Sequence, residues 1–313
     1  MLGKTAGSLY WMFRYLERCE NTARIVEAGF YIALTRGRSA SDELASIMRS
    51  AGVEAKYLET HQTVDGAKVI DFMLRDRDNP VSVRSVIDRA RSNARTARTA
   101  LTREVWEAVN EAWMVVTGAL KTPVGDADVP ALLGEIKRQT ALVRGALEGT
   151  MLRNDIFDFC QLGLHVERAD ATARILDVKY HVLLPSVSRV GGSLDNVQWE
   201  TILRCVSAQR SYGWVTREAP GARDIADFLI LNTAMPRSLA FCQARIAYAL
   251  ISLNDAYGTT HESTRHCARI RERLVPGSID AIFKSGLHEF ISDFLARNQA
   301  LGSRIEQDYR FFA

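Results

Sequence analysis

The chain has 313 residues, which is enough for one large domain or two ordinary ones with a substantial hydrophobic core. Forty basic and 37 acidic residues give a formal net charge of +3, so the overall charge offers no general attraction to nucleic acid or to an anionic membrane. No apolar run approaches the ~20 residues of a membrane-spanning helix. We therefore expect a globular protein without nucleic-acid or membrane partners.

The cysteines show neither a C-x-x-C motif nor the Cys/His spacing of metal ligands; they are Cys19, Cys160, Cys205, Cys242 and Cys267. Because five cysteines cannot all pair, we predict reduced thiols in a cytoplasmic protein, several of them at core positions. The charged N-terminal segment is unlike a signal peptide, which favours the same compartment. Few clusters of turn residues occur, which argues against a β-rich protein.

The first predicted helix runs from Thr5 or Ser8 to about Thr35. Apolar residues cover an unusually large part of its circumference, so we expect it to be central and packed on several sides. Four charged residues share a narrow arc beside the main apolar stripe, at steps of three and four residues; these are Glu17, Glu20, Arg24 and Glu27. The charges therefore lie on one face of a mostly buried helix.

Further helices are predicted along the chain. In the one expected over 80–101, Asn79 is the N-cap and Pro80 is the first helical residue. A second long helix is predicted over about 155–184, where Pro185 would end it. The others are expected at 41–63, 65–76, 80–101, 102–118, 130–153, 260–275 and 278–310.

The first long helix contains a motif that recurs in the second. Residues 16–27 read LERCENTARIVE and residues 166–177 read VERADATARILD, so that Glu17-Arg18 corresponds to Glu167-Arg168. Weaker matches follow in the same order, between 47–57 and 202–212, 71–74 and 227–230, 80–83 and 236–239, and 110–113 and 254–257.

These matches predict an internally duplicated, all-α bundle of roughly a dozen helices. We expect a single domain built from two repeats, about 1–153 and 154–313. The two helices that carry the repeated motif, called the signature helices below, should be central and related by a pseudo-two-fold axis, as in fused duplicates of an ancestral homodimer.

The motifs resemble those of the bacterial alpha-E domain family over essentially the whole chain. The resemblance rests on Leu9-Tyr10-Trp11-Met12-x-Arg14-Tyr15-Leu16-Glu17-Arg18 and on Glu167-Arg168-Ala169-Asp170-x-Thr172-Ala173-Arg174, with Pro236-Arg237-Ser238 as a further match. It implies an all-helical domain that is typically encoded beside, or fused to, circularly permuted ATP-grasp proteins resembling amide-forming ligases.

On this resemblance, the chain is expected to be an accessory or binding component of an ATP-grasp-type peptide or amide ligase (peptide modification) system, with that ligase or another protein of the system as its partner. The sequence is also compatible with a homo-oligomer, and no cofactor is expected. One departure is visible in the second motif, where Leu164-His165 replaces the usual Arg-Tyr before Glu167. The two motifs therefore do not predict two identical half-sites.

No residue is assigned a catalytic role, but the signature helices carry a candidate charged cluster: Glu17, Arg18, Glu20, Arg24, Glu167, Arg168, Asp170 and Arg174. A structural ion network is the favoured interpretation, because Glu20–Arg24 and Asp170–Arg174 have the spacing of ion pairs along one helix. A second interpretation is that the arginines hold an anionic or amino-acid-like ligand.

The third interpretation is a divalent metal, Mg²⁺ or Mn²⁺, held by acids of both helices, with Glu17, Glu20, Glu167 and Asp170 as the candidate ligands. It corresponds to an alternative function, that of a carboxylate-based enzyme acting on a peptide-like substrate. The many neighbouring arginines make it the less favoured function.

Overall fold

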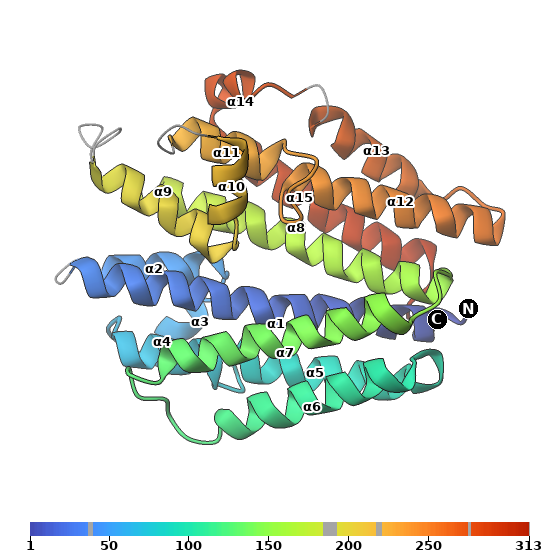
Figure 1. The fold of residues 1–313 in the computed structure, drawn as a ribbon, viewed down its shortest axis with the longest axis horizontal. Coiled ribbons are helices and arrows are strands. Elements are labelled where there is room, and N and C mark those ends of the chain that lie inside the picture. Colours follow the sequence, from blue (N-terminus) through green and yellow to red (C-terminus); the bar gives the residue numbers. More distant parts are fainter. Residues whose placement is uncertain (37–39, 184–192, 217–220, 275–276, 313) are drawn as a thin grey trace.

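The computed structural model describes residues 1–36, 40–183, 193–216, 221–274 and 277–312. In this part of the chain there are fifteen α-helices, one short 3₁₀ helix (η2, Arg98–Ala100) and no strand, which confirms the all-α prediction (Figure 1). The first half contains α1 (Gly3–Arg36), α2 (Ala40–Ser50), α3 (Glu54–Leu58), α4 (Gly66–Leu74), α5 (Val83–Thr96), α6 (Arg103–Ala119) and α7 (Val129–Thr150). The second half contains α8 (Asp155–Leu183), α9 (Ser193–Cys205), α10 (Gln209–Val215), α11 (Ala222–Ile230), α12 (Leu239–Tyr257), α13 (Glu262–Leu274), α14 (Ile279–Ser285) and α15 (Leu287–Asp308).

The signature helices α1 and α8 lie side by side at the centre of the molecule (Figure 1). Helices of the first half lie on one side of this pair and helices of the second half on the other. α1 also contacts α2, α4, α5, α7 and α9, and α8 contacts α2, α9, α12 and α15. Contact on so many sides explains why apolar residues surround α1, and the predicted central position is confirmed.

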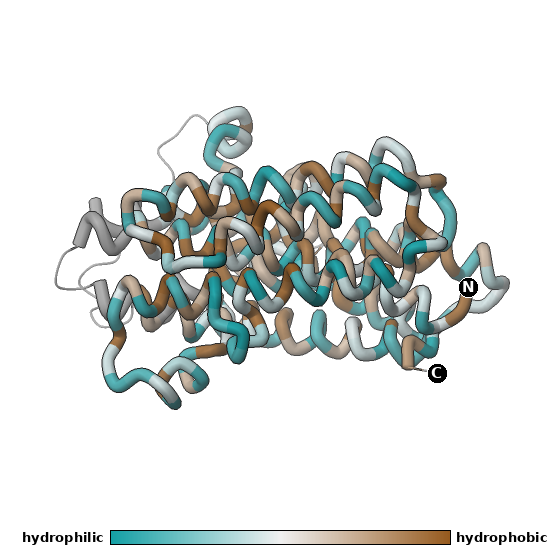
Figure 2. The backbone as a smooth tube through the Cα atoms, turned by 90° about the horizontal axis from the view of Figure 1, so that it is seen from below, coloured by the Kyte–Doolittle hydropathy of each residue, from teal (hydrophilic) through white to brown (hydrophobic). Residues whose placement is uncertain are grey.

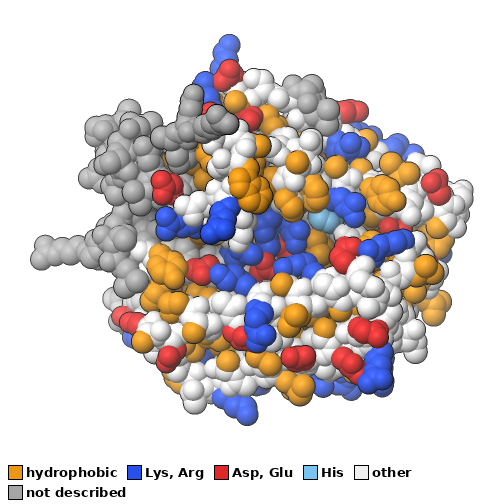
Figure 3. All heavy atoms as spheres, viewed as in Figure 1, with side chains coloured by type: hydrophobic (Ala, Val, Ile, Leu, Met, Phe, Trp, Pro, Cys, Tyr) orange, Lys and Arg blue, Asp and Glu red, His pale blue; other side chains and the backbone are white. Residues whose placement is uncertain are grey.

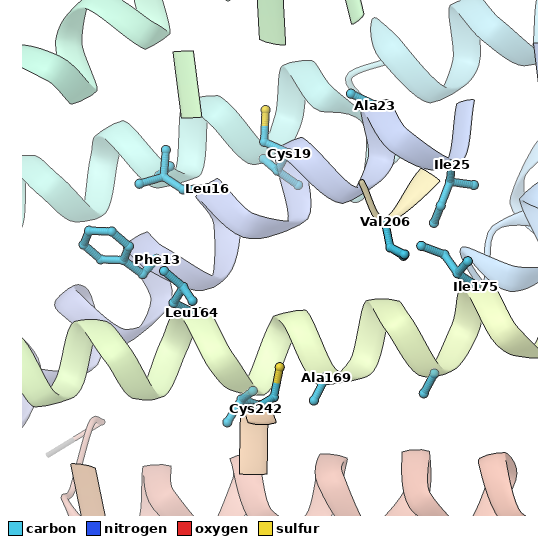
Figure 4. Close-up of a cluster of buried hydrophobic side chains, with 14 of the residues drawn as sticks. Phe13, Leu16, Cys19, Ala23, Ile25, Leu164, Ala169, Ile175, Val206 and Cys242 are labelled. Carbon is cyan, nitrogen blue, oxygen red and sulfur yellow. The ribbon is translucent and has the colours of Figure 1, made fainter. Parts of the chain in front are cut away.

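The two signature helices run in the same direction, since Tyr10 lies beside Gly163 and Glu17 lies beside Arg168. Figure 4 shows the buried side chains of Phe13 and Leu164 next to each other in this interface. The helices that cover this core alternate hydrophobic and hydrophilic residues along their length, as Figure 2 shows. Helices with one apolar and one polar face pack on a core and leave the polar face in water.

Gly163 permits the close approach of α1 and α8. A Cβ atom at this position would lie 2.0 Å from the carbonyl oxygen of Tyr10. Gly163→Ala is therefore expected to push the helices apart and to lower the free energy of unfolding by about 1–3 kcal/mol or more. Urea unfolding measures this effect. Gly145→Ala in α7 is the matched control, because no atom lies within 4 Å of its Cβ, and equal stability of the two variants would contradict the close packing.

Several equivalent segments of the two predicted repeats fold alike. Tyr57 packs edge-on against Phe72 at 5.2 Å between ring centroids, and Tyr212 packs against Phe228 in the same way at 5.5 Å. The chain takes a positive φ at Gly52 after α2, and at Ser207 after α9. Ser82 and Ser238 cap the N-termini of α5 and α12. These likenesses agree with an internal duplication, which stays a prediction.

Some predicted helix boundaries are wrong. The helix predicted over 41–63 is two helices, α2 and α3, because Gly52 adopts a left-handed conformation with φ 72° that ends the first. The helix predicted to begin at Pro80 begins at Val83, because the Ser82 side chain accepts a hydrogen bond from the Ser85 amide. The segment 278–310 likewise divides into α14 and α15. The end predicted at Pro185 lies outside the described residues.

The proposed match between 110–113 and 254–257 is also wrong, since it pairs α6 with the end of α12. The capping serines instead align α12 with α5. α6 packs between α5 and α7, and α13 packs between α12 and α15, so α6 corresponds in position to α13.

Each of the five cysteines is buried and unpaired, so the prediction that several fill core positions is confirmed. Burial raises the pKa of the Cys19 thiol above its usual value, and the same holds for the other four. Of the helices described, none has the length and hydropathy to cross a bilayer.

Candidate functional site

The Glu-Arg dipeptides of α1 and α8 bind each other across the interface between these helices. Arg168 donates from Nε to Oε1 of Glu17 (2.8 Å) and from Nη2 to Oε2 (3.0 Å). Arg18 donates in the same way to Glu167, at 2.5 and 2.9 Å. Bidentate arginine–carboxylate ion pairs of this kind are strong and directional. The reciprocal exchange is the contact that a two-fold relation between the helices would produce.

A second pair of arginines links each signature helix to the other half of the chain. Arg24 binds Glu20 on its own helix (2.6 Å) and donates to the carbonyl oxygen of Cys205 at the end of α9 (2.9 Å). Arg174 binds Asp170 (2.6 Å) and donates to the carbonyl oxygen of Ser50 at the end of α2 (3.2 Å). Both predicted i, i+4 pairs are thus confirmed. Cations at helix C-termini satisfy otherwise unpaired carbonyl groups.

The first charged cluster, as we call it, lies between α1, α7, α8 and the turn before α12; its members are Glu17, Glu20, Arg24, Arg144, Arg168 and Arg237. Arg237 donates to Oε1 of Glu17 (3.1 Å) and to Oε1 of Glu20 (2.6 Å), and Arg144 binds both acids from α7. The sequence did not single out Arg144. Pro236-Arg237-Ser238 appeared only as a motif match, without a role.

The first cluster is almost closed to water. The side chains of Glu17 and Glu20 have no exposed surface, whereas Arg144 is 22% exposed. In Figure 3 basic and acidic side chains gather in the middle of one face, between the two halves of the chain. The ion pairs of Arg168 with Glu17 and of Arg237 with Glu20 join the two halves.

The arginines keep both acids of the first cluster ionised. Burial alone would raise the pKa of Glu17, but Arg168, Arg237 and Arg144 together hold it well below its usual value. Burial and the charge of Glu17 raise the pKa of Glu20, and Arg237, Arg144 and Arg24 outweigh them, which brings it to about 2. Carboxylates this acidic cannot serve as general acids near neutral pH.

The second charged cluster lies on the α8 side of the interface and is more open; its members are Arg14, Arg18, Glu167, Asp170 and Arg174. Arg14 adds to the reciprocal pair by donating from Nε to Glu167 (2.9 Å). Burial raises the pKa of Glu167, and Arg18 and Arg14 lower it below its usual value. The position equivalent to Arg14 is Leu164, so the departure noted in the second motif gives the clusters different partners.

A pocket of about 190 Å³ opens beside the second cluster. Its walls include the apolar side chain of Val81 together with Arg18, Asn21, Glu167, Asp170 and Arg174. The side chain of Arg174 is 38% exposed and that of Asp170 is 19% exposed, so solvent reaches these charges. The amide nitrogen of Asn21 is buried and has no hydrogen-bond acceptor among the described residues.

The arrangement does not favour a metal. In the described residues no group of three or more His, Cys, Asp and Glu side chains is placed to hold a metal ion. Each of the four candidate ligands, Glu17, Glu20, Glu167 and Asp170, instead accepts hydrogen bonds from an arginine. In the closed first cluster a divalent cation would have to displace guanidinium groups or lie beside them, and like charges repel strongly in a buried site. The second cluster offers only two carboxylates, Glu167 and Asp170.

The eight residues predicted from the signature helices thus fall into two clusters, linked by the reciprocal Glu-Arg pairs. The model of the Alpha-E family, described as a predicted alpha-helical domain with a conserved ER motif, matches residues 1–310. Glu-Arg stands at 17–18 and at 167–168, the two dipeptides that bind each other. No curated protein and no solved structure matches the chain.

Proposed function

The chain belongs to the Alpha-E family, and from this we propose that it is a binding component of an amide- or peptide-forming ligase system of the ATP-grasp type, and not an enzyme by itself. In this proposal the chain associates with the ligase and holds an amino-acid- or peptide-like ligand at the pocket of the second cluster.

The pocket is the observation that carries the binding role. It brings a carboxylate (Asp170), two guanidinium groups (Arg18 and Arg174) and an amide without an acceptor (Asn21) around one small volume. A few convergent polar groups beside apolar walls are typical of ligand sites. Amino acids and peptides carry both signs of charge and can pair with such a set.

The buried acids support a role without catalysis. Glu17 and Glu20 are ionised, enclosed and bonded to several arginines, so they have neither the free lone pairs nor the pKa of a catalytic base. The network therefore serves to hold the two halves together, and the pocket is left as the place for a ligand.

Reconstitution with an ATP-grasp ligase from the same genome tests the proposal. We expect the two proteins to co-elute in size-exclusion chromatography, and we expect the chain to raise ATP-dependent product formation about 10-fold or more, because binding energy places the substrate at the ligase. Asp170→Asn should reduce product formation without disrupting the complex.

Glu107→Gln is the control, because Glu107 lies in an exposed ion pair with Arg103, distant in sequence from both clusters. If no complex forms and the ligase works equally well alone, the proposed function is wrong. Peptide hydrolysis or transfer by the purified chain alone would instead favour the enzymatic alternative.

A further inference from the structure

The pocket of the second cluster occupies the place that an arginine fills in the first. Val81 and Arg237 hold equivalent positions, each after a proline (Pro80 and Pro236) and each before the serine that caps the next helix. Arg237 extends from this turn to the acids of α1. Val81, on the opposite turn, lines the pocket beside the acids of α8. Valine has no group that could reach these acids as arginine does.

The acids of the pocket have room for the hydrogen bonds that Arg237 makes in the first cluster. Oε1 of Glu17 accepts from both Arg168 and Arg237. Among the described residues, the equivalent Oε1 of Glu167 accepts from Arg18 alone. Asp170, which stands where Glu20 stands, receives only a long bond of 3.4 Å at Oδ1, from Arg174. Two acceptor oxygens on residues that line the pocket therefore have unused hydrogen-bonding capacity.

The two clusters also differ in their number of arginines. In the first cluster four arginines surround two acids, and in the second cluster three arginines surround two acids. The second cluster thus holds one cation fewer than the first.

We propose that this pocket binds the guanidinium group of an arginine side chain, supplied by free arginine or by an arginine-containing peptide. The inference rests on the proposed function, because it names the ligand of the same site. The planar guanidinium would donate to Glu167 and Asp170, as Arg237 does to Glu17 and Glu20. A volume of about 190 Å³ suits one side chain and not a larger cofactor.

The pocket also suits the aliphatic part of an arginine. Ile25, Ala51 and Val81 contribute apolar walls, against which the methylene groups of the ligand would pack. The side chain of Asn21 also lines the pocket, and its Oδ1 accepts a hydrogen bond from Arg237 of the first cluster. An anion alone fits less well, because it would leave the remaining acceptor positions of Glu167 and Asp170 unused.

Calorimetric titration of the full chain tests the inference, with N-acetyl-arginine amide, L-arginine, N-acetyl-lysine amide and acetate as probes. We expect the capped arginine to bind at least about 10-fold more tightly than the capped lysine, because ammonium lacks the planar fork. Similar affinity for L-arginine would identify the free amino acid as a ligand, and a preference for the capped form would identify a peptide. Equal binding of arginine and lysine, binding of acetate alone, or no binding would overturn the inference.

Val81→Arg is the decisive variant, because it places a guanidinium in the pocket as Arg237 does in the first cluster. This substitution should abolish arginine binding, and the Tm of the variant should equal or exceed that of the original chain. Asp170→Asn should weaken binding by about 10-fold or more, and it serves if Val81→Arg fails to fold. Glu107→Gln should bind as the original chain does. Unchanged arginine binding in Asp170→Asn would overturn the inference. If the chain forms the ligase complex but does not bind arginine, the arginine site is wrong and the proposed accessory function remains valid.

Discussion

Replacing Glu17 with glutamine is expected to lower the free energy of unfolding by about 3–5 kcal/mol, because a buried ion network loses its central acid. Arg168, Arg237 and Arg144 all pair with this carboxylate, whose side chain has no exposed surface. The neutral amide of glutamine no longer compensates the positive charges of these three guanidinium groups, which then repel one another in the buried cluster. Urea unfolding at neutral pH measures the loss.

Two further variants serve as controls for the stability loss expected in Glu17→Gln. Glu107→Gln removes an exposed acid from a pair with Arg103, whose side chains are 57% and 82% exposed, and should change the stability by no more than about 0.5 kcal/mol. Glu167→Gln should fall between the two, because Arg18 is 25% exposed and can be solvated when its partner is lost. A Glu17→Gln variant as stable as Glu107→Gln would show that the network does not hold the halves together.

Acid is expected to weaken the fold through the same network. The pKa of Glu20 is about 2 in the folded chain against an ordinary value of 4.5, so folding favours its ionised form. Its contribution is therefore fully present above pH 4.5 and is lost as the pH falls from 4.5 toward 2. A difference of this size corresponds to about 3 kcal/mol. Glu17 acts in the same direction, since its pKa is also lowered.

Urea unfolding of the original chain and of Glu20→Gln, followed from pH 6 to pH 3, isolates this effect. The original chain should be the more stable at pH 6, and the difference should narrow as acid protonates Glu20 in the unfolded chain. A difference that stays constant over this range would mean that Glu20 does not carry the pH dependence.

The sequence alone determined the all-α class, the two long signature helices and the charged face of each. The apolar residues around α1 and the repeated motif in α8 predicted two central helices, and both contact several neighbours. The pairs Glu20–Arg24 and Asp170–Arg174 followed from the spacing of residues along one helix, which local geometry sets. Helix ends that depend on a single turn residue, as at Gly52, were less accurately predicted.

The tertiary structure decided how the charged faces are used. Glu17 meets Arg168, Arg144 and Arg237, which lie on three other segments far away in the sequence. The copied motif in α8 has different neighbours, because Val81 stands where Arg237 would correspond. Spacing along a helix says which residues share its face, whereas helix packing brings distant side chains to that face. For this reason one motif forms a closed ion network in α1 and borders an open pocket in α8.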